Sequence, residues 1–329
     1  MDSPATPTLP QRSAPAFLDG AAIASALTAL EAVAAMESVL ASGFDPETSA
    51  PRTRVETGSG TFMQMPASHG QYVGTKLLTI TPGNAASASP VIQGLYALFG
   101  GDDQRPLAVL DGVALTELRT SSVSVMGAKL LASPGPKRLV VFGTGVQAWA
   151  HIEAFAEIFE LDSVDIVGRN AEAAERLVKN AEGLGLPAAV ACPEAVRKAD
   201  LVICATASPT ALFDGALVKE SAVVVAIGSH DREHRELDDA LLARATVCVE
   251  SRDSATREAG DIIQALESGA IAGPSHLVTL ADLVLKRREV AAGRPAVFKT
   301  TGMPWEDLAV ATALYEACPR HDYEKWNNR

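Results

Sequence analysis

The chain has 329 residues and a formal net charge of −12 at pH 7. At roughly 100–200 residues per domain this length predicts two domains, and a hydrophobic content of 47% is sufficient for a sizeable core. An acidic surface repels phosphate backbones, so nucleic acid is excluded as a partner. Local arginines and lysines can still line a pocket for a small anionic ligand.

The N-terminal region predicts neither a secretory signal nor a membrane span. Residues 1–16 are rich in Pro, Ser, Thr and Ala and lack a basic start followed by an apolar block. The apolar stretch Ala21–Leu40 is interrupted by Glu31 and Glu37, which predicts one packed amphipathic helix. The four cysteines stand at no metal-ligand spacing. We expect no metal site, no disulfide framework and a cytoplasmic protein.

Short strand-like segments fill the rest of the first third. They carry β-branched or aromatic residues and are separated by Gly, Ser and Pro. The predicted strands are Arg52–Glu56, Gly60–Met65, Tyr72–Ile80, Val91–Phe99 and Pro106–Asp111. A helix is expected next, over Leu115–Leu131, and a Pro-Gly-Pro turn at 134–136 ends it. This region predicts a mixed or antiparallel sheet flanked by helices, which is an α+β domain.

From residue 139 the pattern changes to alternating strands and helices. The expected order is strand Leu139–Phe142, helix Val146–Phe159, strand Ser163–Val167, helix Ala171–Glu182, and strands Ala188–Ala191, Leu201–Ala205, Ala222–Ile227 and Thr246–Val249. Continuous apolar strands that alternate with helices are typical of a parallel sheet covered on both faces. The predicted fold class is therefore α/β, a Rossmann domain combined with the α+β domain before it.

A glycine-containing loop follows the first of these strands. Its sequence is Gly143-Thr144-Gly145-Val146-Gln147-Ala148. In such a loop the first glycine makes the tight turn, the second lets the backbone approach a pyrophosphate, and the small sixth residue allows close helix–strand packing. The N-terminus of the following helix attracts phosphates. The loop, with Gly143 to Gln147 as the contacts, predicts a nicotinamide dinucleotide cofactor. The alternative is a tight turn that binds no ligand.

The end of the second strand distinguishes the two dinucleotides. NAD-specific proteins usually carry an acidic residue there, to hold the ribose 2′-hydroxyl. This chain has Gly168-Arg169-Asn170 instead, and Asp165 lies in mid-strand. Arg169 offers a guanidinium fork to a 2′-phosphate. The prediction is NADPH in preference to NADH, with Arg169 and Asn170 in the cofactor site. The alternative is that Arg169 is a solvated loop charge.

A string of short motifs is spread along most of the chain. It consists of Arg52, Met65-Pro66-Ala67, Gly74-x-Lys76, Pro82-Gly83-Asn84, Leu115-Thr116-x-x-Arg119-Thr120, the Gly143 loop, Glu258-Ala259-Gly260-Asp261, Phe298-Lys299-x-x-Gly302 and Glu306-Asp307-Leu308. The combination resembles the ornithine cyclodeaminase/mu-crystallin family. The resemblance implies a substrate-binding and dimerisation domain of residues 1–118 with 301–329, an inserted Rossmann domain at 119–300, and a homodimer.

The resemblance also implies a small α-amino or α-imino acid substrate. Arg52, Lys76, Arg119 and Thr120 would line its pocket. A substrate carboxylate calls for a bidentate guanidinium, and a desolvated lysine beside an imine can exchange a proton near neutral pH. Lys76 and Arg119 are therefore expected to be catalytic, whereas Arg52 has the alternative of a surface strand charge.

Further cofactor contacts are expected at the ends of later strands. Thr206 and Ala207 follow a buried strand, where a Rossmann fold places the nicotinamide side of the cleft. Gly228 and Lys299 are also expected to contact the cofactor.

One run departs from the cyclodeaminase pattern. Cyclodeaminases carry an aspartate in a run that ends Gly-Lys-Thr-Glu-Leu, and this chain has Gly228-Ser229-His230-Asp231-Arg232-Glu233-His234-Arg235-Glu236-Leu237. Aligned on the final Glu-Leu, the aspartate position falls on His230. The run is more similar to mu-crystallin and bacterial Δ1-pyrroline-2-carboxylate reductases, which lack that aspartate. His230 is a candidate catalytic residue, with a histidine on the rim of the cleft as the equal alternative.

The implied function is NAD(P)H-dependent reduction of a cyclic ketimine carboxylate. The substrate would be Δ1-pyrroline-2-carboxylate or Δ1-piperideine-2-carboxylate, and the product proline or pipecolate. The alternatives within the family are an ornithine cyclodeaminase and an alanine or N-alkyl amino-acid dehydrogenase. An alternative of another class is an NADPH-dependent binding protein without turnover.

Overall fold

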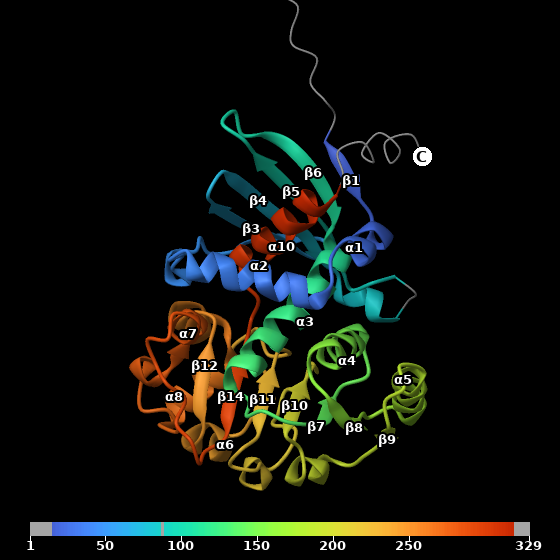
Figure 1. The fold of residues 1–329 in the computed structure, drawn as a ribbon, viewed down its shortest axis with the longest axis vertical. Helices are drawn as coiled ribbons and strands as arrows, with labels where there is room; N and C mark the ends of the chain where they lie inside the picture. Colours follow the sequence, from blue (N-terminus) through green and yellow to red (C-terminus); the bar gives the residue numbers. More distant parts are fainter. Residues whose placement is uncertain (1–14, 87–88, 319–329) are drawn as a thin grey trace, which may run out of the picture.

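Two sheets organise the chain in a computed structural model that describes residues 15–86 and 89–318. In Figure 1 a six-stranded sheet fills the upper part of the molecule and an eight-stranded sheet the lower part. Most of the expected leader, residues 1–14, and the end of the expected C-terminal segment, 319–329, lie outside the described residues. The two-sheet organisation agrees with the predicted combination of an α+β region and a Rossmann domain.

The six-stranded sheet has the order β1-β6-β5-β4-β3-β2. Its strands are β1 (Ala16–Leu18), β2 (Thr53–Thr57), β3 (Gly60–His69), β4 (Tyr72–Ile80), β5 (Ile92–Gly100) and β6 (Arg105–Asp111). Neighbours from β2 to β6 pair antiparallel, and β1 pairs with β6 in parallel. The five predicted strands are confirmed, whereas β1 was not predicted. Two short 3-10 helices, η1 (Pro46–Thr48) and η2 (Pro82–Ala86), lie in its connections.

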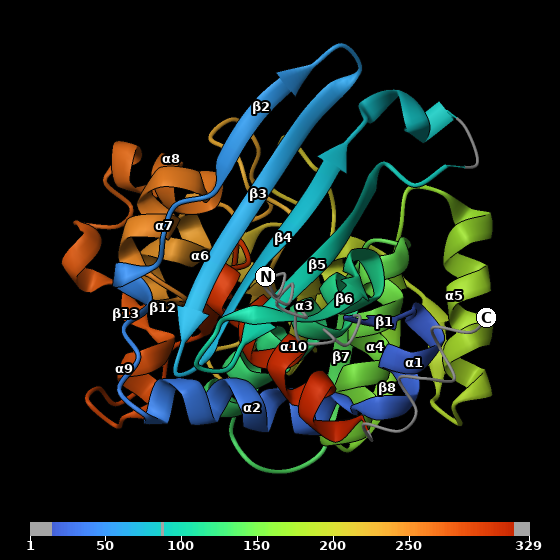
Figure 2. The same ribbon diagram turned by 90° about the horizontal axis from the view of Figure 1, so that it is seen from above.

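Helices cover one face of this sheet. They are α1 (Gly20–Ala26), α2 (Ala29–Ala41) and α10 (Pro304–Ala317). The helix α10 comes from the far end of the chain and packs on β3 and β4, with α2 beside it, as Figure 2 shows. The chain therefore returns to the first sheet at its end, as the family resemblance implied.

The expectation of one helix over Ala21–Leu40 is wrong. The segment forms α1 and α2, which meet at an angle of 79°. Thr28 begins the second helix, because its hydroxyl accepts the N–H of Glu31 at 3.2 Å and Glu31 accepts the N–H of Thr28 at 2.8 Å. Among the described residues, no single helix is long and apolar enough to cross a membrane, and this bent pair meets the criteria of length and composition only when its two helices are joined.

The eight-stranded sheet is parallel throughout and has the order β13-β12-β14-β11-β10-β7-β8-β9. Its strands are β7 (Lys137–Phe142), β8 (Leu161–Val167), β9 (Ala188–Val190), β10 (Leu201–Cys204), β11 (Val223–Ala226), β12 (Thr246–Val249), β13 (Val278–Thr279) and β14 (Ala296–Lys299). The strand order reverses beside β7, which creates a crevice outside the carboxyl ends of β7 and β10.

The connections of this sheet hold its helices. These are α4 (Val146–Ile158), α5 (Ala171–Gly183), α6 (Asp239–Arg244), α7 (Arg252–Glu258), α8 (Gly260–Ser268), α9 (Leu280–Val284) and the 3-10 helices η3 (Pro193–Arg197), η4 (Gly215–Leu217) and η5 (Pro274–His276). The residues of β10, β11 and β14 are all buried, as expected of strands covered on both faces. The Rossmann fold is confirmed, and β13 and β14 were not predicted.

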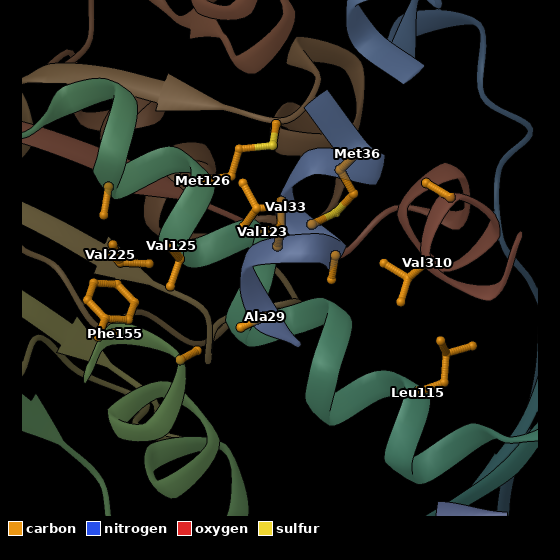
Figure 3. Packing of buried hydrophobic residues seen from close by; sticks show 14 of the residues in the cluster. Ala29, Val33, Met36, Leu115, Val123, Val125, Met126, Phe155, Val225 and Val310 are labelled. Carbon is orange, nitrogen blue, oxygen red and sulfur yellow. The ribbon is translucent and has the colours of Figure 1, made fainter. Parts of the chain in front are cut away.

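The helix α3 (Gly112–Leu131) joins the two sheets. It begins one turn before the predicted start, because Asp111 accepts the N–H groups of Val113 at 2.8 Å and Ala114 at 3.1 Å. Figure 3 shows its apolar side chains between α2, α4, β11 and α10. The expected domain boundary after residue 118 thus falls inside a continuous helix that packs on both units.

Candidate active site

A cavity of about 810 Å³ lies outside the carboxyl ends of β7, β8 and β10. Its walls are Phe142, Gly143, Thr144, Val167, Gly168, Arg169, Asn170, Ala191, Pro193, Ala205, Thr206, Ala207, Ser208 and Leu212. The cavity therefore occupies the crevice where a Rossmann fold binds a dinucleotide. Six predicted cofactor contacts line it, in the Gly143 loop, at Arg169 and Asn170, and at Thr206 and Ala207.

The Gly143 loop has the form of a phosphate cradle. Gly143 adopts a φ of +119°, and a Cβ there would lie 2.4 Å from the carbonyl oxygen of Ala205. A Cβ on Gly145 would meet no atom within 4 Å, so protein packing does not require this glycine. The N-terminus of α4 has no side-chain cap. Its first N–H groups and the open space at Gly145 fit a pyrophosphate.

The residues after β8 differ in what they offer this cavity. Arg169 is exposed and forms no ion pair with any residue that the structure describes. The side chain of Asn170 is engaged, because it accepts the N–H of Ala173 at 2.9 Å and caps α5. Both residues line the cavity, and the side chain of Arg169 is the one that carries a charge.

A buried ionic cluster joins the six-stranded sheet to α3 and α10. The side chains of Lys76 and Asp307 are 2% and 0% exposed, and Lys76 Nζ lies 2.9 Å from both carboxylate oxygens of Asp307. Arg119 Nε donates to Asp307 Oδ1 at 3.0 Å. One carboxylate therefore holds the predicted lysine and the predicted arginine side by side, although the three residues lie far apart in the sequence.

Arg52 joins the same site from the segment before β2. Its Nη2 donates to the carbonyl oxygen of Gly302 at 2.8 Å and lies 2.9 Å from Glu258 Oε2. A Cβ on Gly302 would lie 2.3 Å from Arg119 Nη1, so this glycine is in contact with both arginines. The side chain of Arg52 is only 10% exposed, which excludes the alternative of a surface strand charge.

Two further carboxylates support Arg119 from behind. Glu306 accepts the N–H of Met303 at 3.0 Å and faces Arg119 Nη1 at 3.5 Å. Glu250 accepts the N–H groups of Thr301 at 2.9 Å and Gly302 at 3.1 Å. Burial, together with the negative charge of Glu250, raises the pKa of Glu306 well above its ordinary value. Asp307 accepts from Arg119 Nε at 3.0 Å, so it is the nearer of the two carboxylates on Arg119, and Glu306 lies farther away at 3.5 Å.

The environment of Lys76 prepares it for proton exchange. Burial and, to a smaller extent, the positive charge of Arg119 lower its pKa, Asp307 acts in the opposite direction, and the net result is a fall from the ordinary 10.5 to about 8. A lysine with such a pKa is an effective general acid near neutral pH.

The remaining predicted residues occupy different positions. His230 is exposed in the loop after β11, and desolvation and the cations Lys299 and Arg52 lower its pKa. Thr120 is buried, and its hydroxyl hydrogen-bonds to no described residue.

Five of the eleven predicted cofactor contacts are not on the cavity wall, namely Gly145, Val146, Gln147, Gly228 and Lys299. Lys299 is fully buried beside Asp261, at 3.1 Å, because the end of β14 is covered. The N–H of Gly228 donates to Glu236 Oε2 at 2.7 Å and is unavailable to a ligand. Gln147 has a buried side chain oxygen in α4 and is not on the cavity wall.

The anionic half of the site was not predicted. Asp307 and Glu306 stood in a quoted motif without a role, and Glu250 was not singled out. A signal was present, since both segments put carboxylates into apolar runs, Trp305 to Val310 and Val247 to Glu250. Charges in buried runs need partners.

Comparisons with known proteins show which family the chain resembles. A family model described as the ornithine cyclodeaminase/mu-crystallin family matches residues 16–321. The ketimine reductase mu-crystallin of Mus musculus is 33% identical over 243 residues, which is 74% of this chain and 75% of that protein. The Δ1-pyrroline-2-carboxylate reductase of Paracoccus denitrificans (strain Pd 1222) is 34% identical over 262 residues, 78% of this chain and 83% of that protein.

A solved structure extends the likeness to three dimensions. An archaeal alanine dehydrogenase dimer with bound NAD has a TM-score of 0.84 and 27% sequence identity, and the match covers 92% of this chain and 95% of that one. The chain belongs to the ornithine cyclodeaminase/mu-crystallin family.

Proposed function

We propose that the protein is an NAD(P)H-dependent ketimine reductase. It reduces Δ1-pyrroline-2-carboxylate or Δ1-piperideine-2-carboxylate to L-proline or L-pipecolate. The observation that carries the proposal is the buried pair Lys76 and Arg119 on the single carboxylate of Asp307, a proton donor beside a carboxylate receptor. The mu-crystallin and Paracoccus relatives are named for ketimine and Δ1-pyrroline-2-carboxylate reduction, which supports the same chemistry.

The two arginines bind the substrate carboxylate. No described residue accepts a hydrogen bond from Nη2 of Arg119 or Nη1 of Arg52, so both guanidinium groups keep donors for a ligand. A fork of guanidinium donors matches a carboxylate in geometry and charge. Asp307 is a positioning residue, because it fixes Arg119 and Lys76 relative to each other without occupying the donors that the substrate needs.

Lys76 supplies the proton to the imine nitrogen. Its pKa of about 8 keeps it protonated at neutral pH and still acidic enough to give the proton up. A protonated imine carbon accepts a hydride far better than a neutral one. When bound, the reduced nicotinamide cofactor supplies that hydride. His230, which is exposed in the loop after β11, is proposed as a further substrate contact.

For the cofactor, Gly143, Thr144 and Gly145 hold the pyrophosphate together with the first N–H groups of α4, at Val146 and Gln147. NADPH is the preferred form and NADH a possible one. Support comes from the exposed guanidinium of Arg169 on the cavity wall, which can pair with a 2′-phosphate. A comparison of KM for NADPH and NADH tests this preference, and a clear preference for NADH would reject it.

The protein also acts as a cytoplasmic homodimer in this proposal. Figure 2 views the face of the six-stranded sheet that carries no helix among the described residues. Alternation along the strands puts Phe17, Phe62 and Leu95 on this face, and they are 52%, 37% and 40% exposed. Apolar faces of this kind are typical of protein interfaces. The dimeric archaeal structure supports the same assembly, and light scattering on the purified chain measures it.

We further propose the domain division of residues 1–118 with 301–329 and 119–300, with α3 as the shared helix. Both boundaries lie at the ionic cluster, since Arg119 follows the first and Gly302 the second. The substrate site therefore lies where the two domains meet.

A screen of substrates tests the proposed activity. Purified protein is mixed with NADPH and, in turn, with the two cyclic imines, pyruvate plus ammonia, pyruvate plus methylamine, and L-ornithine with NAD⁺. Oxidation of NADPH with a cyclic imine and formation of the cyclic amino acid support the proposal. Release of ammonia from ornithine without net cofactor turnover would reject the proposal in favour of a cyclodeaminase. Oxidation of NADPH with pyruvate and an amine, but with neither cyclic imine, would reject it in favour of an amino-acid dehydrogenase.

A further inference from the structure

A second buried ionic cluster lies behind the carboxyl ends of β10, β11 and β14. It consists of Glu236, Asp261 and Lys299, and all three side chains are fully buried. Asp261 Oδ2 lies 3.1 Å from Lys299 Nζ. Burying charge is unfavourable unless partners compensate it, so a cluster with two carboxylates and one ammonium calls for an explanation. The proposed reduction uses none of these groups directly.

Glu236 bridges two neighbouring strand ends. Its Oε1 accepts both the N–H and the hydroxyl of Thr206 at 2.7 Å, and its Oε2 accepts the N–H of Gly228 at 2.7 Å. Burial raises the pKa of Glu236, and Lys299 together with the donors from Thr206 and Gly228 opposes this rise by stabilising the ionised carboxylate. Thr206 is itself on the wall of the cofactor cavity. The carboxylate of Glu236 is therefore separated from the cavity by a single residue, Thr206.

The surroundings hold Glu236 in this place. Asp261 Oδ1 accepts the N–H groups of Glu236 at 2.7 Å and Leu237 at 2.8 Å. A Cβ on Gly228 would lie 1.7 Å from the carbonyl oxygen of Thr206, and one on Gly260 would lie 2.0 Å from that of His234. The backbone is thus closely packed at Gly228 and at His234, and the hydrogen bonds to both oxygens of Glu236 hold its carboxylate at the strand ends.

The position of the Glu236 carboxylate bears on the relative stability of the oxidised and reduced cofactor. In a Rossmann fold the dinucleotide binds outside the carboxyl ends of the strands, so the residues at the ends of β10 and β11, among them Thr206 on the cavity wall, would hold its nicotinamide end. Hydride donation transfers one proton together with two electrons to the substrate. It leaves the nicotinamide ring with a positive charge. A fixed negative charge behind the ring favours the oxidised form over the neutral reduced form.

We propose that Glu236 is a positioning residue that fixes the strand ends at Thr206 and Gly228 and stabilises the positive charge that develops on the nicotinamide. Lys299 sets the size of this effect, because its ammonium offsets one of the two carboxylates. The inference rests on the proposed function for the place of the cofactor and assigns Lys299 a role in the cluster in place of a direct cofactor contact.

Binding of the two cofactor forms without substrate tests this inference. The readout is the ratio of Kd for NADP⁺ to Kd for NADPH, measured by titration calorimetry on the full chain. Glu236→Gln removes the charge and nearly preserves the shape, and we expect this ratio to rise about tenfold, as for one charge at short range in a medium of intermediate dielectric constant. The measurement needs no imine, so it stands whether or not the chain reduces cyclic ketimines.

Two further variants separate charge from structure. Lys299→Met removes the cation and is expected to lower the ratio, in the direction opposite to Glu236→Gln. It also provides the test if Glu236→Gln does not fold. Glu47→Gln is the matched control, since Glu47 accepts hydrogen bonds from Ser251 Oγ at 2.8 Å and Arg252 N at 2.7 Å but does not line the cofactor cavity. It should leave the ratio within about twofold of the wild type.

The inference is overturned if the folded variants weaken both cofactor forms by the same factor. Equal weakening would mean that the cluster only maintains the shape of the loop. A ratio that moves in the same direction in Glu236→Gln and Lys299→Met would also contradict it, because charges of opposite sign must have opposite effects.

Discussion

The cofactor cavity and the substrate cluster are built in opposite ways. The cavity is open, about 810 Å³ in volume, and lies at three neighbouring strand ends, where eight of its fourteen lining residues are Gly, Ala, Ser or Thr. The substrate cluster is closed, with Lys76 and Asp307 almost fully buried, and its side chains come from β4, α3 and α10. A site built from backbone N–H donors requires only glycines and the N-terminus of a helix. A site built from buried charged side chains requires countercharges fixed beside them.

The difference determines how each region tolerates change. Loss of one contact in the open cavity leaves the others, and water fills the space. Loss of one charge in the closed cluster leaves its partner unpaired inside the protein, which is strongly unfavourable. Substitutions in the cluster should therefore have larger effects than substitutions in the cavity.

The largest effect on activity is expected for Lys76→Met. It removes the proton donor, and general acid catalysis of this kind contributes roughly 10²–10⁴-fold to a rate. We expect kcat with a cyclic imine to fall by that factor while Kd for NADPH stays within about twofold, since Lys76 is not on the cavity wall. Steady-state kinetics and cofactor titration measure the two. Lys129→Met, at an exposed lysine of α3, is the control and should keep full activity.

The largest effect on stability is expected for Asp307→Asn. It leaves Lys76 and Arg119 buried without their shared anion, which costs about 3–5 kcal/mol of unfolding free energy. Urea denaturation measures this loss. Asp253→Asn breaks an exposed ion pair with Arg257 and should cost about 0–1 kcal/mol. Equal losses in the two variants would mean that the cluster is not a closed, low-dielectric site.

In the open cavity, Arg169→Ala should change cofactor preference without abolishing turnover. A hydrogen bond to a charged group is worth about 1.5–3 kcal/mol, so the ratio of kcat/KM for NADPH to that for NADH should fall by about 10–100-fold. Kinetics with both cofactors give this ratio. If the ratio is unchanged, Arg169 is a solvated loop charge.

The pH dependence of kcat/KM and of stability tests the role of Lys76 in the substrate cluster. Lys76 must be protonated to act, so kcat/KM should fall about tenfold per pH unit above its pKa of about 8. In the unfolded chain this lysine keeps its ordinary pKa of 10.5, so the unfolded state binds more protons between pH 8 and 10.5. The contribution of Lys76 to stability therefore rises with pH over the window in which activity falls. Rates that stay constant to pH 10 would exclude Lys76 as the acid.

The smallest effect is expected for His230→Ala. Because Lys76 supplies the proton and His230 is exposed in the loop after β11, kcat should fall by less than about tenfold. Steady-state kinetics at neutral pH check this. A fall of a hundredfold or more would make His230 the essential acid and reverse the assignment.

The same contrast explains what the sequence could predict. The Gly143 loop and Arg169 were predicted from local pattern, because a strand, a turn and a helix start follow one another within a few residues. The parallel sheet was predicted from continuous apolar runs. The break at Thr28 was missed, since a capping box inside an apolar stretch is weaker than the helical pattern around it.

The carboxylates that pair with Lys76 and Arg119 could not be predicted from neighbouring residues in the sequence. Asp307 meets Lys76 across 231 residues, and only the fold shows that one carboxylate serves both cations. Lys299 was predicted to contact the cofactor, but its ammonium lies 3.1 Å from Asp261 at the buried end of β14. The family resemblance supplied Lys76, Arg119 and Arg52, and physical reasoning about buried charge supplies their partners.

The stoichiometry of one reaction tests the central claim most directly. Purified protein, NADPH and Δ1-piperideine-2-carboxylate are incubated, the absorbance of NADPH is followed, and pipecolate is quantified by chiral chromatography. We predict one L-pipecolate for each NADPH oxidised, and none with Lys76→Met. Tight binding of NADPH without oxidation by either cyclic imine would contradict the account and identify a binding protein.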